Sequence, residues 1–290
     1  MKKILSLLTV GAIVGLVGCN VYAGSLVENL IENDARPLVY TSFHAMYEFT
    51  KAIAGDSLRI EVLTPPGASA HHWEPSIQDM VRLSGAEAFI YHGSGMEHFV
   101  DALRGSLENE VKFIEASANV EALLGQSDPH LWLNPLYALQ IKETIKNGLI
   151  EISPENTIVF TANFEIVARM IWDLDEAYRN ASEQFVRHDI VVSHAAFGHL
   201  SHAYGLNQVA IEGMRIRGDP TPARMVDIIS FVRENGVTTI FYDKDSALAE
   251  SVAAGTGTRT AMLDTFEGIT SEDYFTVMWR NLEVLIEALS

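Results

Sequence analysis

The chain has 290 residues, of which 48% are hydrophobic and 20% charged, so it can bury a core and form one large domain or two ordinary ones. Acidic residues outnumber basic ones by 38 to 20, which gives a formal charge of −18. This charge argues against nucleic acid as a partner, because binding phosphates needs a basic face. The single cysteine excludes an internal disulfide and any multi-thiolate metal site within one chain. The ten histidines must therefore carry most soft-metal chemistry.

The first residues have the pattern of an export signal. Two lysines precede an apolar run that is too short to span a membrane, and the run ends in Leu16-Val17-Gly18-Cys19. This ending resembles a bacterial lipobox, in which the cysteine receives the lipid. Secretion with cleavage after Ala23 is the alternative. We expect residues 1–18 to be the signal peptide, Cys19 to be lipidated and residues 19–35 to be a tether, so that the mature protein works outside the cytosol, anchored to a membrane by its lipid.

After the tether, strand-like and helix-like segments alternate through two similar halves. The expected strands are Leu38–Phe43, Leu58–Leu63, Ala88–Tyr91, Val111–Glu115, Asp189–Ser193, Gln208–Ile211, Thr239–Tyr242 and Thr260–Leu263. Such alternation favours parallel sheets with helices on both faces. We therefore expect an α/β fold with two doubly wound parallel-sheet lobes, one over residues 36–155 and the other over residues 187–290.

One long helix is expected between the halves. The segment from Ile158 to Phe185 contains no proline or glycine, and its apolar residues recur at steps of four and three. Such a helix would be about 42 Å long. A break near Asp173-Leu174-Asp175 is the alternative. A continuous helix over residues 156–186 would be a rigid linker that restricts wide hinge motion between the lobes.

Candidate metal ligands follow several of the expected strands. They are His71 and His72 in a loop with two prolines and a glycine, His130 between two prolines, His194 directly after a strand, and Asp264 at the end of the last strand. In parallel α/β sheets, ligands bind beyond the carboxyl ends of the strands. A cation held between the lobes would take two ligands from each. A lone histidine in a loop is more often a surface residue, and Asp264 could instead cap a turn.

Four stretches of the sequence together resemble one known family. They are Pro66-Gly67 with His71-His72-Trp73-Glu74-Pro75, Asp128-Pro129-His130-Leu131-Trp132, Ser193-His194-Ala195-Ala196-Phe197-Gly198, and Asp219-Pro220-Thr221-Pro222. The family is that of the zinc/manganese substrate-binding lipoproteins of bacterial ABC importers (cluster A-I), and the resemblance covers nearly everything after the signal. It implies two lobes joined by a rigid helix, one metal in the cleft, no enzymatic activity, a monomer, and the membrane permease and ATPase subunits of an importer as partners.

The resemblance also implies a ligand set. Position by position, the metal ligands map to His71, His130, His194 and Asp264. Ala70 stands where the family usually has proline, so that His72 stays open as an alternative to His71. The histidine-rich loop of many zinc-binding members is missing, because Val120 to Ser127 contains no histidine.

Ligand chemistry then favours zinc as the transported ion. Three imidazoles and one carboxylate suit four-coordinate Zn²⁺, whereas Mn²⁺ prefers more oxygen ligands. Members that resemble manganese importers often carry glutamate where this chain has His194. Mn²⁺ remains the alternative cargo. Two other classes stay open: a surface adhesin and a zinc-dependent hydrolase, for which Glu74 and Glu212 are the acids near the proposed ligands. The chain has no His-Glu-x-x-His motif, and four protein ligands would close the site to water.

Overall fold

The computed structural model describes residues 34–120, 128–213 and 220–290. Two four-stranded sheets lie within them, and all their strand pairs are parallel. The first sheet has the order β2-β1-β3-β4, formed by β1 (Leu38–Thr41), β2 (Arg59–Val62), β3 (Ala88–Tyr91) and β4 (Lys112–Glu115). The second has the order β6-β5-β7-β8, formed by β5 (Asp189–Val192), β6 (Asn207–Ala210), β7 (Thr239–Tyr242) and β8 (Arg259–Met262). The expected α/β fold with two parallel-sheet lobes is confirmed.

Both sheets reverse their strand order at an equivalent place. From β1 the chain goes to β2 on one side, and β3 then pairs with the other side of β1; β5, β6 and β7 repeat this arrangement. The loops that leave neighbouring strands at such a point run in opposite directions and open a crevice beyond the carboxyl ends. Each sheet thus offers a place for a ligand at the same edge.

Helices connect the strands, and several of them begin at a side-chain cap. They are α2 (His44–Ala54), α3 (Ile77–Leu83), α4 (Val100–Leu107), α5 (Pro135–Ile152), α6 (Thr157–Ser182), α7 (Gly198–Ala203), α8 (Pro222–Glu234), α9 (Ala247–Thr256) and α10 (Tyr274–Leu289), with 3₁₀ turns η1 (Leu131–Leu133) and η2 (Pro154–Asn156). Thr221 caps α8 through the main-chain N–H of Arg224, and Asp273 caps α10 through that of Thr276. Asp219, part of the motif before α8, lies outside the described residues.

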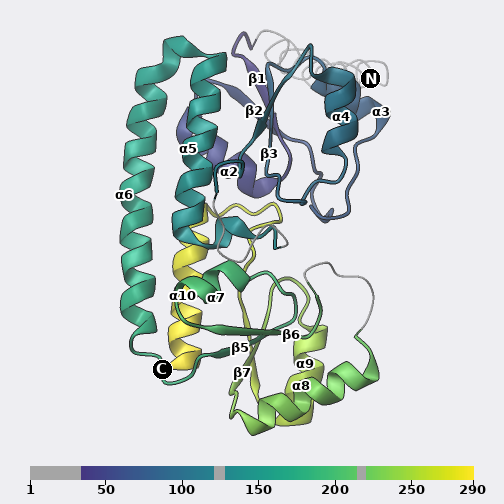
Figure 1. Ribbon diagram of the computed structural model, residues 1–290, viewed down its shortest axis with the longest axis vertical. Helices are drawn as coiled ribbons and strands as arrows, with labels where there is room; N and C mark the ends of the chain where they lie inside the picture. The colour runs from purple at the N-terminus through teal and green to yellow at the C-terminus, as the bar shows by residue number, and fades with distance from the viewer. Residues whose placement is uncertain (1–33, 121–127, 214–219) are drawn as a thin grey trace, which may run out of the picture. The chain divides into compact units, whose positions relative to one another are not determined.

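The long helix expected between the halves is present as α6. It has 26 residues and continues through Asp173–Asp175 without a break. In Figure 1 it runs beside α5 and extends from the level of the first sheet to that of the second, and it contacts α2, α5 and α10. Tyr178 on its buried face donates a hydrogen bond of 2.8 Å to the carbonyl of Met278 in α10. The buried carboxylate of Asp175 accepts hydrogen bonds from Tyr204 (2.9 Å) and Arg179 (2.8 Å). The bonds to Met278 and from Tyr204 fasten α6 to the second half, whereas the Arg179 bond lies within the helix.

The two halves also share one hydrophobic core. Its largest cluster contains Phe49 and Trp132 from the first half and Phe241 and Tyr274 from the second. The rings of Phe49 and Tyr274 meet edge to face with centroids 4.9 Å apart. Contact across the halves is therefore extensive and apolar, which limits their relative motion.

Two further observations concern the membrane. No helix in residues 34–120, 128–213 and 220–290 is long and apolar enough to cross a bilayer. The expected signal peptide over residues 1–18, the lipidated Cys19 and most of the tether lie outside the described residues.

Candidate metal centre

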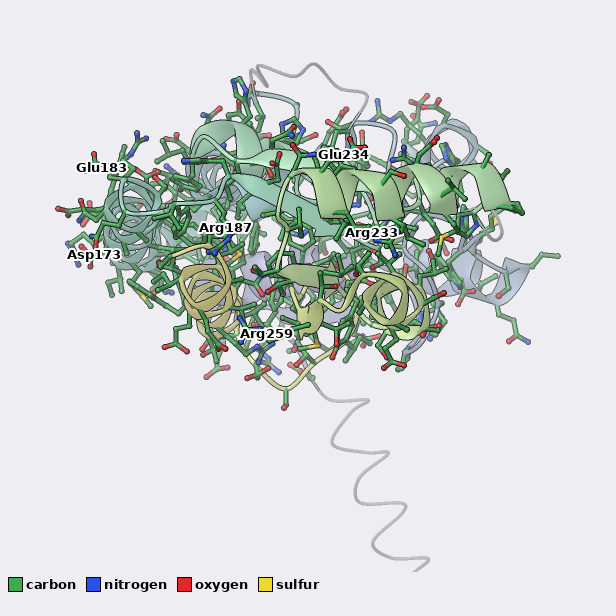
Figure 2. All side chains as sticks on the ribbon, turned by 90° about the horizontal axis from the view of Figure 1, so that it is seen from below. Asp173, Glu183, Arg187, Arg233, Glu234 and Arg259 are labelled. Atoms are coloured by element: carbon green, nitrogen blue, oxygen red, sulfur yellow. The ribbon has the colours of Figure 1, made fainter. Side chains whose placement is uncertain are left out.

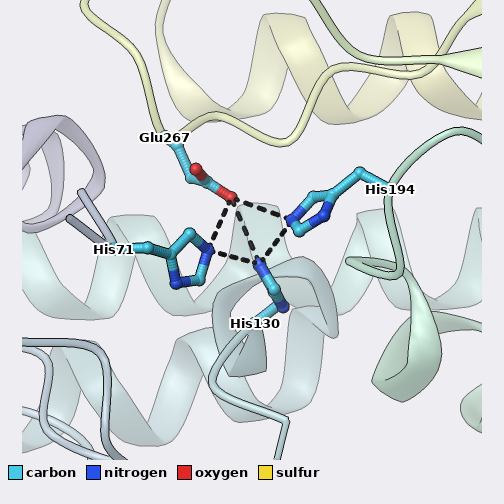
Figure 3. A group of neighbouring side chains, drawn as sticks. All are labelled: His71, His130, His194 and Glu267. Atoms are coloured by element: carbon cyan, nitrogen blue, oxygen red, sulfur yellow. Dashed lines mark hydrogen bonds and ion pairs between the residues drawn. The ribbon is translucent and has the colours of Figure 1, made fainter. Parts of the chain in front are cut away.

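Four side chains from separate loops meet at one point of the structure. His71 comes from the loop after β2, His130 from the turn before η1, His194 from the loop after β5, and Glu267 from the loop after β8. The first two belong to the first half of the chain and the last two to the second half. Figure 3 shows that they point toward a common centre.

The distances among the four ligand atoms are those of a metal site. His130 Nε2 lies 3.2 Å from the Nε2 atoms of both His71 and His194. Glu267 Oε1 lies 3.2 Å from His130 Nε2, 3.7 Å from that of His71 and 3.9 Å from that of His194. A tetrahedral zinc with bonds of about 2.0–2.1 Å places its ligand atoms about 3.3 Å apart. The observed spacing fits this geometry.

The four groups are buried, and one of the ligand atoms has no hydrogen-bond partner in the part of the chain that the structure describes. All four side chains are buried, and Glu267 is 8% exposed. Among the residues that the structure describes, Glu267 Oε1 has no partner in hydrogen-bond geometry. A buried carboxylate oxygen without such a bond is costly unless a cation is bound to it. The donor set of three imidazoles and one carboxylate therefore fits a divalent metal.

Hydrogen bonds through Nδ1 orient two of the histidines. His130 Nδ1 donates to Asp128 Oδ1 at 2.7 Å, which leaves Nε2 as the atom that faces the cluster. His194 Nδ1 donates to the carbonyl of Gly213 at 3.2 Å, with the same consequence. Such partners fix the tautomer and ring direction of a metal-binding histidine. The sequence alone does not reveal this role of Asp128.

Two other buried histidines hold the Asp128–His130 turn. His92 Nε2 donates to the carbonyl of Pro129 at 2.7 Å, and His199 Nε2 donates to that of Asp128 at 2.9 Å. His92 follows β3 of the first half, whereas His199 lies in α7 of the second. The turn that carries His130 is thus fixed from both halves of the chain.

The charges of the cluster shift its pKa values. Burial lowers the pKa of His130, but its hydrogen bond to Asp128 and its ion pair with Glu267 outweigh burial and raise this pKa to about 9. Burial raises the pKa of Glu267, yet His130 and His71 hold it well below its usual range. Burial, together with the neighbouring His130, lowers the pKa of His194. The cluster therefore holds an ionised Glu267 and an additional proton on the ring of His130. A divalent cation that binds to the four groups would displace this proton.

Of the expected ligands, the structure brings together the three histidines but not Asp264. The carboxylate of Asp264 instead accepts hydrogen bonds from the Phe266 main-chain N–H at 2.8 Å and from the Arg280 guanidinium at 3.0 Å. This is the turn-capping role that the sequence left open. The acid in the cluster is Glu267, three residues further along the same loop. Between the adjacent histidines, His71 joins the cluster and His72 is exposed.

The conformation of the loop after β8 explains why Glu267, rather than Asp264, points toward the histidines. Phe266 is fully buried and adopts φ = 57°, a left-handed conformation that is rare for a non-glycine residue. The Asp264 carboxylate bonds the N–H of this residue and so supports the reversal. The reversal turns Glu267 toward the histidines. In the sequence, Glu267 is a second acid in the loop that follows this strand. No feature of the sequence favours Glu267 over Asp264 as a ligand.

Comparison with known proteins identifies the family. The sequence model described as zinc-uptake complex component A, periplasmic (ZnuA) matches residues 39–288. The zinc-binding lipoprotein AdcA of Streptococcus pneumoniae (strain ATCC BAA-255 / R6) is 31% identical over 311 residues, a match that covers 98% of this chain and 60% of AdcA. The high-affinity zinc uptake system protein ZnuA of Bacillus subtilis (strain 168) is 28% identical over 277 residues and matches 87% of each chain.

The fold agrees with this relationship. The crystal structure of the Zn(II)-bound ZnuA-like domain of S. pneumoniae AdcA superimposes with a TM-score of 0.79 at 31% identity, covering 88% of this chain and 99% of that domain. The present chain thus spans 60% of the length of full pneumococcal AdcA. The family match over residues 39–288 includes both sheets and all four residues of the cluster. The chain belongs to the family of the zinc-uptake complex component A.

Proposed function

We propose that this chain captures Zn²⁺ outside the cytosol, with His71, His130, His194 and Glu267 as its ligands, and delivers the ion to an ABC importer. The observation that carries the proposal is the convergence of three Nε2 atoms and one carboxylate oxygen, all within 4.8 Å of one another, in a buried place. The names of the relatives support it, because pneumococcal AdcA is described as zinc-binding and the B. subtilis ZnuA as part of a zinc uptake system.

Zinc is favoured over manganese by the donor atoms. Three nitrogens and one oxygen at tetrahedral spacing suit a d¹⁰ ion with no preference for higher coordination. Mn²⁺ lies at the weak end of the divalent affinity order and gains most from oxygen ligands. A carboxylate from Glu267 supplies the one negative charge of the inner set and partly offsets the charge of the bound ion.

The partners and the location belong to the same proposal. The importer would supply a membrane permease and an ATPase, and this chain would dock as a monomer. It would dock through its two lobes, residues 36–155 and 187–290, which are joined by the helix over residues 156–186. Lipidation at Cys19 would hold the protein at the membrane. The family description as a periplasmic component and the description of AdcA as a lipoprotein support this location.

A role in capture explains the site better than hydrolysis does. A catalytic zinc keeps an open position for water, usually with three protein ligands. Here four buried side chains converge. A closed set of this kind holds an ion rather than activating water.

The test is metal content followed by competition. Protein purified without added metal should contain about one zinc per chain, and apo protein should bind Zn²⁺ far more tightly than Mn²⁺ in calorimetric titration. His71→Ala should weaken zinc binding strongly, whereas His72→Ala, the neighbouring histidine outside the cluster, should leave the stoichiometry unchanged. Tighter binding of Mn²⁺, or equal effects of the two substitutions, would contradict the proposal.

A further inference from the structure

A cavity of about 210 Å³ adjoins the metal cluster. Three of the four cluster residues, His71, His194 and Glu267, line its inner wall. Its outer wall includes Asp243, Lys244 and Asp245, of which Lys244 and Asp245 are exposed. The cavity therefore leads from the protein surface to the ligand atoms.

The inner wall carries the Glu267 carboxylate, which a bound cation would stabilise. Glu267 is more than nine-tenths buried, lines this cavity, and has no partner in hydrogen-bond geometry for Oε1 within the described part of the chain. A cation that arrives through the cavity meets this oxygen together with His71 and His194. His130 completes the set from the far side, because it is fully buried and does not line the cavity.

The outer wall is formed by the turn that leaves β7. Asp243 Oδ1 accepts the main-chain N–H of Lys244 at 2.6 Å, and Asp245 Oδ1 accepts that of Ala247 at 2.9 Å, at the start of α9. The main chain thus fixes both carboxylates at the mouth. The charge of Asp243 reaches the cluster, where it opposes the lowering of the His194 pKa by burial and by His130.

Lys244 stands between these two acids and carries the opposite charge. Its side chain lies against Gly268, the neighbour of Glu267: a Cβ atom built at Gly268 would come within 3.1 Å of Lys244 Cε and 3.2 Å of Nζ. The absence of a side chain at Gly268 lets the lysine rest on the loop that presents the carboxylate. A positive charge at this place repels an incoming dication.

We propose that this cavity is the access route of the cation, that Asp243 and Asp245 draw the ion in, and that Lys244 limits the rate at which it enters. The inference rests on the proposed function, since it assumes that the cluster binds a divalent ion. Charges that line a narrow mouth raise the local concentration of counter-ions and speed association, and the effect falls as salt increases. The three side chains of the turn would thus set the association rate without touching the bound metal.

The experiment is stopped-flow association of Zn²⁺ with apo protein, followed by tryptophan fluorescence. Trp132 is a suitable reporter, because its ring centroid lies 5.4 Å from that of His130. At low ionic strength, Asp243→Asn/Asp245→Asn should lower the association rate constant about three- to tenfold, and Lys244→Gln should raise it. Both differences should shrink at high salt.

A matched control removes the same charge elsewhere. Asp173→Asn/Glu183→Gln takes two negative charges from α6 and from the residue that follows it, where Figure 2 shows both side chains directed away from the body of the protein. This control should associate with zinc at close to the wild-type rate. If the mouth variant slowed association no more than the α6 variant, or if Lys244→Gln did not speed it, the inference would be overturned.

The outcome also separates this inference from the proposed function. Wild-type protein that takes up no zinc would overturn the proposed function and the inference together. Wild-type and variant proteins that all bind one zinc, at indistinguishable rates, would overturn the access route alone.

Discussion

Trp132 Nε1 donates a hydrogen bond of 2.8 Å to the main-chain carbonyl of Thr265. Trp132 follows His130 by two residues and Thr265 precedes Glu267 by two, so this bond ties together the loops that present a histidine and the carboxylate. The Tyr274 hydroxyl adds a bond of 2.9 Å to the carbonyl of Trp132. The relative position of two cluster residues from different halves is therefore set by buried hydrogen bonds.

Trp132→Phe should destabilise the protein and weaken zinc binding. Phenylalanine keeps much of the packing but leaves the Thr265 carbonyl without its partner, which costs about 1–3 kcal/mol. Urea denaturation of the apo protein measures the loss. Trp172→Phe is the matched control, because Trp172 is 54% exposed on α6. Equal losses in the two variants would show that the hydrogen bond has no special role.

Glu267→Gln and Asp264→Asn should separate binding from folding. Glu267→Gln removes the negative charge from the proposed ligand set and should lower zinc affinity by more than about 100-fold. Substituting a residue that only hydrogen-bonds to a ligand typically lowers metal affinity by about 10- to 100-fold. Asp264→Asn weakens the contact to Arg280 and the support of the turn at Phe266. It should cost about 1 kcal/mol of apo stability and change affinity less. Calorimetric titration measures the zinc affinity of both variants, and thermal melts measure their stability. A larger loss of affinity in Asp264→Asn than in Glu267→Gln would indicate that Asp264 is the ligand.

Asp128→Asn should weaken zinc binding about 10- to 100-fold, the range for a partner that orients a metal-binding histidine. The amide can no longer stabilise a positive or polarised His130 ring as the carboxylate does. Competition with a chelator of known affinity measures the change, with Asp173→Asn as a control for the loss of one charge. An unchanged affinity would mean that the 2.7 Å contact between Asp128 and His130 does not matter for the metal.

Zinc binding should release a proton at neutral pH. The pKa of His130 is raised from its ordinary 6.5 to about 9, so its protonation stabilises the folded apo protein fully below about pH 6.5 and is lost as the pH rises through 9. Zinc must expel this proton, and affinity should rise about tenfold per pH unit across this window.

The measurement is calorimetry at pH 7.5 in two buffers with different heats of ionisation. About one proton per zinc is expected from the wild type, and fewer from Asp128→Asn, which removes a main cause of the raised pKa. Binding without proton release would contradict a protonated His130.

Cys19→Ser tests the anchor. If Cys19 accepts the lipid as proposed, the variant should appear in the soluble fraction or as an uncleaved precursor. Zinc affinity of the purified variant should be unchanged, since the cluster lies in other segments of the chain. Mass spectrometry and detergent partitioning measure the lipid directly. Wild-type protein without lipid would favour secretion by cleavage after Ala23.

The sequence by itself determined the fold and most of the site. Apolar and β-branched runs located each strand within a few residues, because the central strands of a parallel sheet are buried on both faces. The same reasoning predicted α6 through its uninterrupted apolar steps from Phe160 to Tyr178. Histidines at strand ends could be anticipated because parallel strands bring their carboxyl ends to one edge.

Only the tertiary structure decided which acid completes the cluster. Asp264 and Glu267 share one loop, and no local rule separates them in the sequence. The choice depends on the left-handed turn at Phe266 and on the bonds from Arg280 to Asp264 and from Trp132 to Thr265. Those partners lie 16 and 133 residues away along the chain. The direction of a side chain in an irregular loop is set by such distant contacts, and for that reason periodicity and spacing could not supply it.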